Sequence, residues 1–444
     1  MNAPTKTGGT EALFHPDTYV TGVPHELMGQ LRREHGVVWV PEPAVDNWPA
    51  GPGFWAVLRY ADVETVLRSP QVFSSSLGLT QIYDAPPPLL PPLRKMMINM
   101  DPPDHSRLRG LLTKAFAPRA VAKLEDRIAG HARELVAAVV DRGSCNFARD
   151  IAADLPLLTL SDILGVPESD RWLMFDWSNR VIGVQDAEYQ ASSEFDTSGA
   201  TEMAIRALQV RPDPDENGRM PDSRVPSGMA DLYAYARELA QYRRKEPADD
   251  IMSLLMQQVD SEGGRVSNDE WEKLFWLFSV AGNETVRNAL PGGMYALLTH
   301  PDQYAKLRAD RSLLNSAVEE MLRWWSPVTQ FRRTAARDTS LAGVEIREGD
   351  KVVVYFASAN RDETVFADPD AFDITRNPNP HIAFGHGPHF CIAAQLARVQ
   401  MRALFGAVLE LLGEVAADGP PERLRSNFQN GIKHLPIRWT TPET

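Results

Sequence analysis

Hydrophobic side chains along the chain recur mostly with the period of a helix. In the stretches 131–140, 231–245 and 395–412, apolar residues return every three or four positions, which places them on one face of a helix. The alternation typical of a strand is rarer and occurs in two stretches, 53–60 and 344–356. The pattern therefore predicts a mainly α fold with a small β region that is assembled from distant parts of the chain.

Three segments interrupt this periodicity. In VEIREGDKVVVYF, the residues Glu348, Gly349 and Asp350 are typical of a turn, so this stretch predicts a hairpin. The polar segment 192–228 is rich in Asp, Pro, Gly, Ser and Arg and predicts a surface insertion. The segment 83–95, YDAPPPLLPPLRK, carries five prolines, which argue against regular helix and interior strand.

Composition is that of a globular protein and argues against some partners. The 444 residues are 43% hydrophobic and 24% charged, as in ordinary folded domains. The formal net charge of −13 disfavours non-specific binding to nucleic acid or to an anionic membrane, because both need a basic surface. No apolar run is long enough to span a bilayer. We therefore expect a water-soluble protein of the cytoplasm.

Only two cysteines occur, Cys145 and Cys391, which excludes a disulfide framework and favours a reducing compartment. Cys145 lies in DRGSCNFARD, a polar turn after a helical stretch, and we interpret it as structural. A lone cysteine in an apolar setting is more often a small buried hydrophobic residue than a ligand. The residues around each cysteine therefore decide its interpretation.

Cys391 follows a glycine-containing loop and leads directly into an amphipathic helix, in HIAFGHGPHFCIAAQLARVQ. Free N–H groups and the positive end of the dipole at a helix N-terminus stabilise a thiolate and lower the pKa of the thiol. Gly385 and Gly387 have no Cβ, so this loop can approach a flat cofactor closely. The stretch is the strongest candidate site in the sequence.

The apolar stretch FWLFSVAGNETVRNAL predicts a long helix. A capping-box pattern of Ser267 and Glu270 indicates that this helix begins near Asn268. Pro291 lacks an N–H group and predicts a bend, but the helical pattern continues after it. We therefore expect one bent helix rather than two.

Glu284 and Thr285 stand inside this apolar helix, where a carboxylate and an alcohol are costly unless they are hydrogen-bonded. One interpretation is structural: Thr285 bonds to a carbonyl one turn earlier and Glu284 pairs with an arginine such as Arg287. The other is chemical, because a carboxylate and a hydroxyl linked to solvent can pass protons to a reacting group.

A further polar pattern lies in NMDPPDHSRLRGLL, where Asp101 is expected to cap a helix that begins at Pro102. His105 and Arg109 then stand four apart on one face of the helix, so both can reach the same anion. Taken singly, each would be interpreted as a solvated surface group.

Several of these motifs resemble signatures of the cytochrome P450 family. FGHGPHFC is similar to the family's haem-binding loop, and AGNET is similar to its distal helix, where a local opening makes an oxygen-binding groove. EEMLRWWSP resembles its Glu-x-x-Arg pair, although Glu320 and Arg323 alone are typical of a surface salt bridge. The resemblance runs from about residue 54 to 412 with the motifs in the family's order.

This resemblance implies one domain over residues 1–444 with the cytochrome P450 fold, a triangular prism of helices that encloses a haem. The segment 192–228 then falls in the region that covers the substrate. Two residues depart from the family's pattern: Ala393 stands where glycine is usual, and Val286 replaces a second threonine. Alanine adds one methyl group, so we expect slight displacement at this contact rather than loss of haem.

The resemblance also implies a role for each matching residue. Cys391 would be the metal ligand. Further contacts to the haem would come from Phe384, Gly385, Ile392 and Ala397, and the propionates would be bound by His105, Arg109, Arg333 and His389. A buried network behind the haem would contain Glu320, Arg323 and Arg376.

On the distal side, Ala281 and Gly282 would form the oxygen groove, and Glu284 with Thr285 would deliver protons to dioxygen. Candidates for the substrate pocket are Phe275, Phe278, Val280, Ala281 and Val328, all of them apolar. They predict a hydrophobic small molecule of steroid, terpenoid or fatty-chain type.

The implied activity is that of a haem-thiolate monooxygenase with haem b as its cofactor. Since the chain carries no flavin or iron–sulfur domain, electrons from NAD(P)H would arrive through an external reductase and ferredoxin. Cations that could attract an acidic ferredoxin are Arg107, Lys114, Arg398 and Arg402. Two alternatives stay open: a haem-thiolate enzyme that uses or rearranges a peroxide, and a non-catalytic haem sensor. The Glu284 and Thr285 pair argues against the first.

Overall fold

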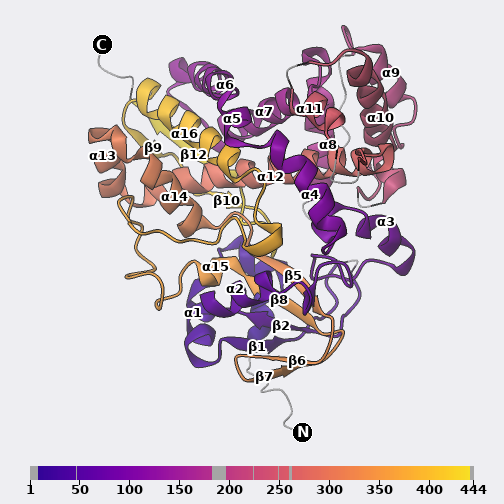
Figure 1. Cartoon of the computed structure of the whole chain (residues 1–444). Coiled ribbons are helices and arrows are strands. Elements are labelled where there is room, and N and C mark those ends of the chain that lie inside the picture. Colours follow the sequence, from indigo (N-terminus) through magenta and orange to yellow (C-terminus); the bar gives the residue numbers. More distant parts are fainter. Residues whose placement is uncertain are drawn as a thin grey trace.

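The computed structural model describes residues 9–46, 48–182, 197–223, 225–248, 250–259 and 263–440. Helices make up a large body, and a smaller part holds most of the strands (Figure 1). This arrangement confirms the mainly α fold with a small β region. Within the described residues, no helix is both long and apolar enough to cross a membrane.

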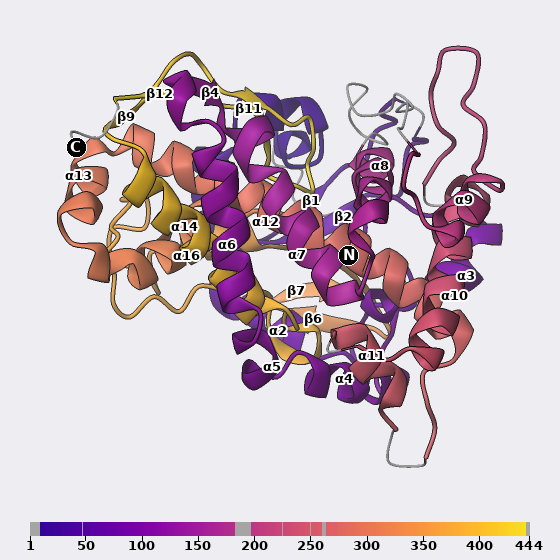
Figure 2. The ribbon, with the colours of Figure 1, turned by 90° about the horizontal axis from the view of Figure 1, so that it is seen from above.

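The helices of the large body surround one long central helix, α12. They are α4 (Asp104–Ala115), α5 (Pro118–Ala122), α6 (Glu125–Ala137), α7 (Asp154–Leu164), α8 (Arg171–Ile182), α9 (Glu202–Leu208), α10 (Ala230–Lys245), α11 (Ile251–Gln257), α12 (Asn268–Thr299), α13 (Pro301–Ala309), α14 (Leu314–Trp325) and α16 (Ala394–Leu411). Helix α12 packs against α7, α8, α10 and α14 and crosses the middle of the molecule (Figure 2).

Helix α12 begins as its cap predicts. The Ser267 hydroxyl accepts a hydrogen bond from the Glu270 N–H at 3.2 Å, and the Glu270 carboxylate accepts one from the Ser267 N–H at 2.8 Å. The helix runs for 32 residues and continues through Pro291. Because of its length, α12 contacts α8 and α10 and also passes through the centre of the helical body.

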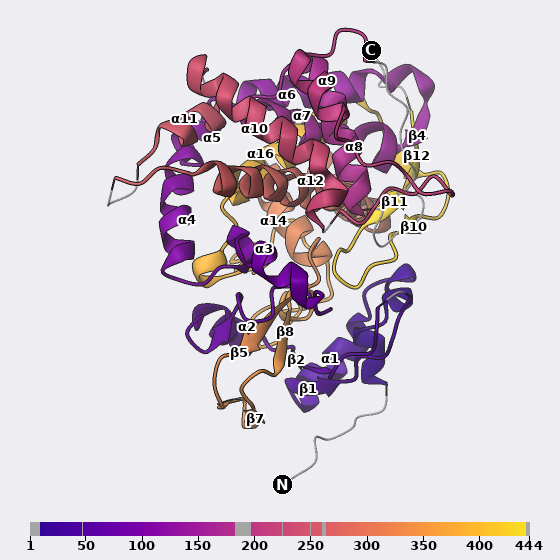
Figure 3. The same ribbon diagram turned by 90° about the vertical axis from the view of Figure 1, so that its right-hand side faces the viewer.

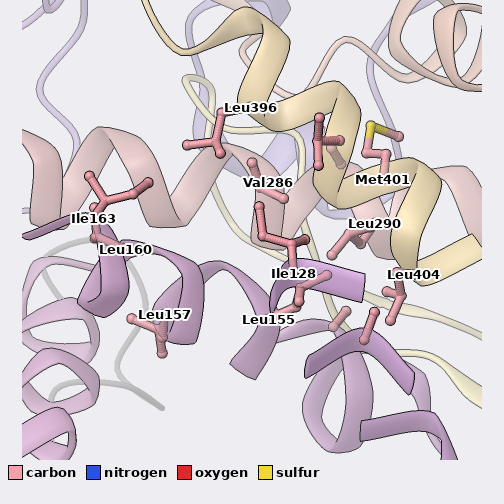
Figure 4. Packing of buried hydrophobic residues seen from close by; sticks show 14 of the residues in the cluster. Ile128, Leu155, Leu157, Leu160, Ile163, Val286, Leu290, Leu396, Met401 and Leu404 are labelled. Atoms are coloured by element: carbon pink, nitrogen blue, oxygen red, sulfur yellow. The ribbon is translucent and has the colours of Figure 1, made fainter. Parts of the chain in front are cut away.

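Buried aliphatic side chains join four helices into the main core. Ile128 comes from α6, Leu160 from α7, Val286 from α12 and Leu396 from α16, and they meet in the interior (Figure 4). Each of these residues is at most 5% exposed. Val286, which replaces the expected threonine, therefore serves as a core residue.

The smaller part contains a five-stranded sheet and shorter helices. The sheet has the order β1-β2-β8-β5-β3 and comprises β1 (Val37–Val40), β2 (Phe54–Val57), β8 (Lys351–Tyr355), β5 (Gln330–Ala335) and β3 (Phe73–Ser74). The neighbouring helices are α1 (His25–Glu34), α2 (Tyr60–Arg68), α3 (Leu90–Arg94) and α15 (Phe356–Ala359). As predicted, the sheet joins distant segments: β2 pairs with β8 in parallel, almost 300 residues further on.

The predicted hairpin over 344–356 is wrong in its pairing. Strand β7 (Val344–Ile346) pairs antiparallel with the preceding strand, β6 (Thr339–Leu341), and β8 pairs with β2 and β5. Ala342 and Gly343 both have positive φ, +49° and +80°, which is the geometry of a tight two-residue hairpin turn. The residues around Gly349 do turn the chain, but they send β8 into the large sheet.

Cys145 is not in a turn. It lies in strand β4 (Ser144–Asn146) of a small sheet with β12 (Pro436–Trp439) and β9 (Val415–Ala417), opposite Ile437. Burial raises the pKa of its thiol to about 12, so the sulfur stays protonated and unreactive. The structural interpretation of Cys145 fits this position. A further pair of strands is β10 (Glu422–Arg423) and β11 (Ile432–His434).

Two segments predicted to be irregular contain helices. In the proline-rich segment, α3 (Leu90–Arg94) carries its prolines in the first turn, where a missing N–H group costs no hydrogen bond. Of the segment 192–228, residues 192–196 and 224 lie outside the described residues. The described part contains α9, which packs on α10 on the side of α12 away from the large sheet (Figure 3). Ala204 and Ala207 of α9 are buried there, whereas Ile205 is 40% exposed, so this part contains a packed helix as well as polar surface loop.

Candidate active site

A mostly apolar cavity lies beside the middle of α12. Its walls come from α4, α7, α12, α16, strand β5 and the loop that carries Cys391. Most of the predicted site residues line it: His105, Arg109, Phe278, Ala281, Gly282, Thr285, Val328, Arg333, Phe384, Gly385, His389, Cys391, Ile392 and Ala397. The fold thus brings together segments that are almost 300 residues apart in the chain.

The Cys391 loop is shaped by two glycines with positive φ, +72° at Gly385 and +66° at Gly387. At Gly387 an added Cβ would lie 2.3 Å from the Leu67 carbonyl oxygen, so this glycine permits close contact with the end of α2. We predicted that its role is close approach to a cofactor; the close neighbour is protein backbone. The Cys391 N–H donates to the Phe384 carbonyl at 2.9 Å, which closes the loop.

Cys391 stands just before α16, whose first residue is Ala394. The expectation of a lowered thiol pKa is wrong for the chain alone. Burial raises the pKa of Cys391, and the Ala393 N–H, Arg109 and Arg398 offset only part of this increase. The desolvation cost of a thiolate outweighs these favourable interactions. Ala393 has φ −97°, a conformation that does not require glycine.

Four basic side chains lie together on one side of the cavity. Arg333 is 4% exposed, has no carboxylate within ion-pair distance among the described residues, and donates to the Arg332 carbonyl at 2.8 Å. His105 is 1% exposed and neither of its ring nitrogens has a hydrogen-bond partner. The centre of the His389 ring lies 4.1 Å from that of His105, with the two rings tilted by 41°, and Arg109 lines the same cavity. Buried donors without acceptors are costly, so this group is suited to an anion.

The pKa values agree with this interpretation. Burial, together with the nearby charges of Arg109 and Arg333, lowers the pKa of His105 to about 4. Burial lowers the pKa of Arg333 to about 10, and the charge of Asp101 opposes this shift. Both shifts mean that the positive charge lacks enough compensation in the protein alone.

Asp101 does not cap the next helix, contrary to prediction. Its carboxylate instead accepts hydrogen bonds from the Ser75 N–H at 2.8 Å and the Ser76 hydroxyl at 2.9 Å. Helix α4 begins at Asp104, with Pro103 in the cap position. Asp101 therefore ties the segment before α4 to the end of β3, and this tie helps to position the His105 side of the cavity.

Glu284 and Thr285 point in different directions. The Thr285 hydroxyl lines the cavity and donates to the Ala281 carbonyl at 2.9 Å, which is the local bond of the structural interpretation. Glu284 does not line the cavity: it is 3% exposed and accepts a hydrogen bond from the Ser178 hydroxyl of α8 at 2.9 Å. Burial raises the pKa of Glu284 to about 7, although Arg287 and Ser178 partly offset the increase.

Ser178 was missed by the sequence analysis. It lies 106 positions before Glu284, in a helix without a recognisable motif, so no local signal links the two residues. Asn283 is also buried at this point and its amide donates to the Ser178 hydroxyl. The partner of the buried carboxylate is thus set by the packing of α8 on α12.

Glu320 and Arg323 are both completely buried, which rules out a surface salt bridge. The Arg323 Nε and Nη2 donate to the Glu320 carboxylate at 2.7 and 2.8 Å. Arg376 donates to the same carboxylate at 3.2 Å, so the predicted third member is present. Arg323 also donates to the carbonyls of Asn360, Pro369 and Ala371. The pair anchors α14 to the segment before the Cys391 loop.

The sequence pattern of the cytochrome P450 family matches residues 19–413. The chain belongs to the cytochrome P450 family. Three similar proteins illustrate the relationship. The steroid C26-monooxygenase of Mycobacterium tuberculosis is 37% identical over 433 residues, which cover 96% of this chain and 92% of that protein.

The methyl-branched lipid omega-hydroxylase of Mycobacterium bovis is 37% identical over 416 residues, which cover 92% of this chain and 90% of that protein. A cytochrome P450 of Mycobacterium marinum, solved in complex with pseudoionone, superposes with a TM-score of 0.79 and 37% identity, and covers 93% of this chain and 94% of that one. The protein is therefore a cytochrome P450 monooxygenase, as the motifs predicted.

Membership of this family implies a haem iron cofactor, and the cavity fits it. Haem carries two propionates, and the cavity presents on one side the Arg333 guanidinium, which has no carboxylate partner among the described residues, and the His105 ring, which has no hydrogen-bond partner. Haem iron would need a ligand from the protein, and Cys391 lines the same cavity. The His105 ring is otherwise without a hydrogen-bond partner, so its position supports the fit independently of the comparisons.

Two residues that the sequence predicted for the substrate pocket of this cytochrome P450 do not line the cavity. Phe275 is completely buried and packs edge-on against Trp177 at 5.9 Å and Trp271 at 5.6 Å. Val280 is also absent from the wall, although Phe278 and Ala281 line it. Residues three or four apart share a helix face, and Val280 stands on a different face from these two. Leu277 and Phe331, which the sequence analysis did not identify, line the cavity instead.

The predicted docking cations of the cytochrome P450 are less available than expected. Arg107 forms an ion pair with Glu270. Arg398 is 23% exposed and binds both carboxylate oxygens of Glu319, at 2.6 and 2.8 Å. Lys114 is exposed. Charges neutralised within the protein attract an acidic partner only weakly, so at least two of the four cations contribute less than predicted.

Proposed function

We propose that this cytochrome P450 hydroxylates a hydrophobic small molecule of steroid, terpenoid or branched fatty-chain type. The observation that carries the proposal is that one mostly apolar cavity is lined by Cys391, Thr285 and the four basic residues that lie together on one side, among them His105, whose ring has no hydrogen-bond partner. The names of two relatives, steroid C26-monooxygenase and methyl-branched lipid omega-hydroxylase, favour the same substrate class. The reaction consumes dioxygen, two electrons and two protons and releases the alcohol and water.

Haem, when bound, supplies the activation of dioxygen and the insertion of one oxygen atom into a C–H bond, and a thiolate ligand favours O–O cleavage. We infer that Cys391 is this ligand. His105, Arg109, Arg333 and His389 would bind the propionates, which would give the unbonded His105 ring an acceptor and the Arg333 guanidinium a negative partner. Phe384, Gly385, Ile392 and Ala397 would contact the flat faces and edges of the cofactor.

Glu284 and Thr285 would deliver the protons that the reduction of dioxygen requires. A pKa of about 7 lets the Glu284 carboxyl hold a proton or release it near neutral pH. The Thr285 hydroxyl donates its hydrogen bond to the Ala281 carbonyl, but its oxygen can still accept a hydrogen bond from a water in the cavity. Ala281 and Gly282 leave room beside that hydroxyl because their side chains are small.

Substrate selection would depend on apolar surfaces. Phe278 and Val328 line the cavity together with Phe331, whose ring packs edge-on against Phe428 at 5.3 Å. Rings held in this way form a rigid wall that suits a branched or polycyclic hydrocarbon.

We further propose that electrons come from NAD(P)H through a separate reductase and ferredoxin, and that the protein acts in the cytoplasm. Phe390, next to Cys391, is 41% exposed, and exposed Lys114 stands at the end of α4. Exposed aromatic and basic side chains suit a partner with an apolar centre and an acidic rim. Two free cysteines agree with a reducing compartment.

The deciding experiment replaces Cys391 with histidine and records the Soret band of the reduced carbonyl complex. Thiolate ligation shifts this band strongly to the red, so we expect the shift in the wild type and in Cys145→Ser and its loss in Cys391→His. An unchanged band in Cys391→His would refute the ligand assignment. Turnover of apolar substrates with ferredoxin and reductase, compared with peroxide alone, then separates a monooxygenase from a peroxide-using enzyme. A sensor would give no product in either assay.

A further inference from the structure

Glu319 connects two parts of the proximal side that the sequence separates. It lies on α14 next to Glu320, but it points to different partners. Its carboxylate lies 3.0 Å from His381 Nε2 at the start of the Cys391 loop. The same carboxylate accepts two hydrogen bonds from Arg398 on α16, at 2.6 and 2.8 Å. One side chain therefore holds the beginning of the loop and the helix that follows it.

Arg398 in turn lies against the loop itself. Its guanidinium carbon is 4.5 Å from the centre of the Phe384 ring, and the His381 ring lies 5.9 Å from the same ring. The Phe384 carbonyl is the acceptor for the Cys391 N–H, at 2.9 Å. A chain of direct contacts thus runs from Glu319 through Arg398 and Phe384 to the backbone of Cys391.

The Glu319 carboxylate stays ionised beside Arg398 and His381. Burial opposes ionisation of Glu319, but the hydrogen bonds and charges of Arg398 and His381 outweigh it and lower the pKa of Glu319 to about 2. The carboxylate is therefore ionised at every working pH. His381 is buried, with its side chain 2% exposed, and Arg398 is only 23% exposed. Partly buried charges are screened less by solvent than surface charges, so they act on nearby groups.

We propose that Glu319, Arg398 and His381 form a positioning cluster for the Cys391 ligand. The cluster fixes the loop geometry and sets the local charge balance beside the sulfur, and thereby sets the reduction potential of the bound iron. Arg398 favours the extra negative charge of the reduced state, and Glu319 limits that effect. The inference rests on the proposed ligand role of Cys391.

The test measures the midpoint potential of the ferric/ferrous couple in holoenzyme variants. Arg398→Gln removes the positive charge that lies against the loop and leaves Glu319 with His381 alone, so we expect a lower potential. Glu319→Gln keeps an acceptor for His381 but leaves the guanidinium uncompensated, so we expect a higher potential. Each shift should correspond to a change of up to about tenfold in the reduction equilibrium, about 59 mV for one electron. The double variant should return toward the wild-type potential, because both charges are gone.

A second arginine–glutamate pair, which joins α6 to α16, gives a control. Arg133 and Glu410 form an ion pair at 2.5 Å, and Glu410 lies twelve residues beyond Arg398, about 18 Å along the helix axis. Arg133→Gln and Glu410→Gln should leave the potential unchanged. A shift in the same direction for both cluster variants, or no shift in either, would overturn the proposal, because a merely structural disturbance has no reason to reverse sign with the charge removed.

The wild-type spectrum keeps the two hypotheses distinguishable. If the reduced carbonyl complex of the wild type lacks the red-shifted band, the ligand assignment itself has failed. If the band is present and the potentials do not shift in opposite directions, only the positioning cluster has failed. Conservative replacement adds a further criterion: Arg398→Lys keeps the charge, so its potential should lie closer to that of the wild type than to that of Arg398→Gln.

Discussion

The raised pKa of Glu284 makes a quantitative prediction about the pH dependence of stability. The carboxyl is buried against Ser178, and burial moves its pKa from the ordinary 4.5 to about 7. Between these two values the folded protein binds a proton that the unfolded chain releases, so stability falls as pH rises through this window. A difference of about 2.5 pKa units corresponds to about 3 kcal/mol, which is lost in full above about pH 7.

Glu284→Gln removes this ionisation while it keeps an oxygen that can accept the Ser178 hydrogen bond. The variant should therefore be more stable than the wild type, and its advantage should grow with pH. Between about pH 5.5 and about pH 8 we expect the advantage to increase by about 2 kcal/mol. Urea unfolding of the holoenzymes at both pH values, followed by tryptophan fluorescence, measures this increase.

Glu345→Gln provides the control, because Glu345 lies exposed in strand β7 and undergoes the same atomic change. Its effect on the free energy of unfolding should be equal at both pH values. An advantage of Glu284→Gln that does not grow with pH would show that burial does not govern the ionisation of this carboxyl. The proposal of Glu284 as a proton donor near neutral pH would then lose its physical basis.

Three further outcomes are expected. Arg323→Ala should cost about 3–5 kcal/mol and lower the haem content, because it removes the two shortest hydrogen bonds of the completely buried Glu320 and leaves only Arg376 to balance its charge. Urea unfolding and the haem-to-protein ratio test this. Arg333→Gln should weaken haem retention roughly tenfold or more, because it loses a charged hydrogen bond worth about 1.5–3 kcal/mol. Haem transfer to an acceptor protein measures this loss. Arg337→Gln, on the surface, should retain haem as the wild type does. Thr285→Ala should keep haem and substrate binding but divert electrons to hydrogen peroxide; full coupling of electrons to product would exclude Thr285 from proton delivery.

Local patterns in the sequence were sufficient for the elements and for the main motif. The capping box of Ser267 and Glu270 predicted the start of α12, since both hydrogen bonds form within one turn. The motif around Cys391 predicted a loop followed by a helix, and the structure has both. Spacing also predicted that His105 and Arg109 face one site, because residues four apart share a helix face.

Partners and burial were decided by the tertiary structure. Ser178 bonds Glu284 and Glu319 binds Arg398 across long stretches of chain, so no periodicity could reveal either pair. The thiol of Cys391 has a raised rather than a lowered pKa because desolvation depends on everything packed around it. The partners of β8 were also decided by the tertiary structure. Strand β7 turns back onto β6 at Ala342 and Gly343, where φ is positive, so β8 is left to pair with the distant β2 and β5. Sequence determines what a residue can do within its own helix or turn, and packing determines which groups lose water and which charges meet.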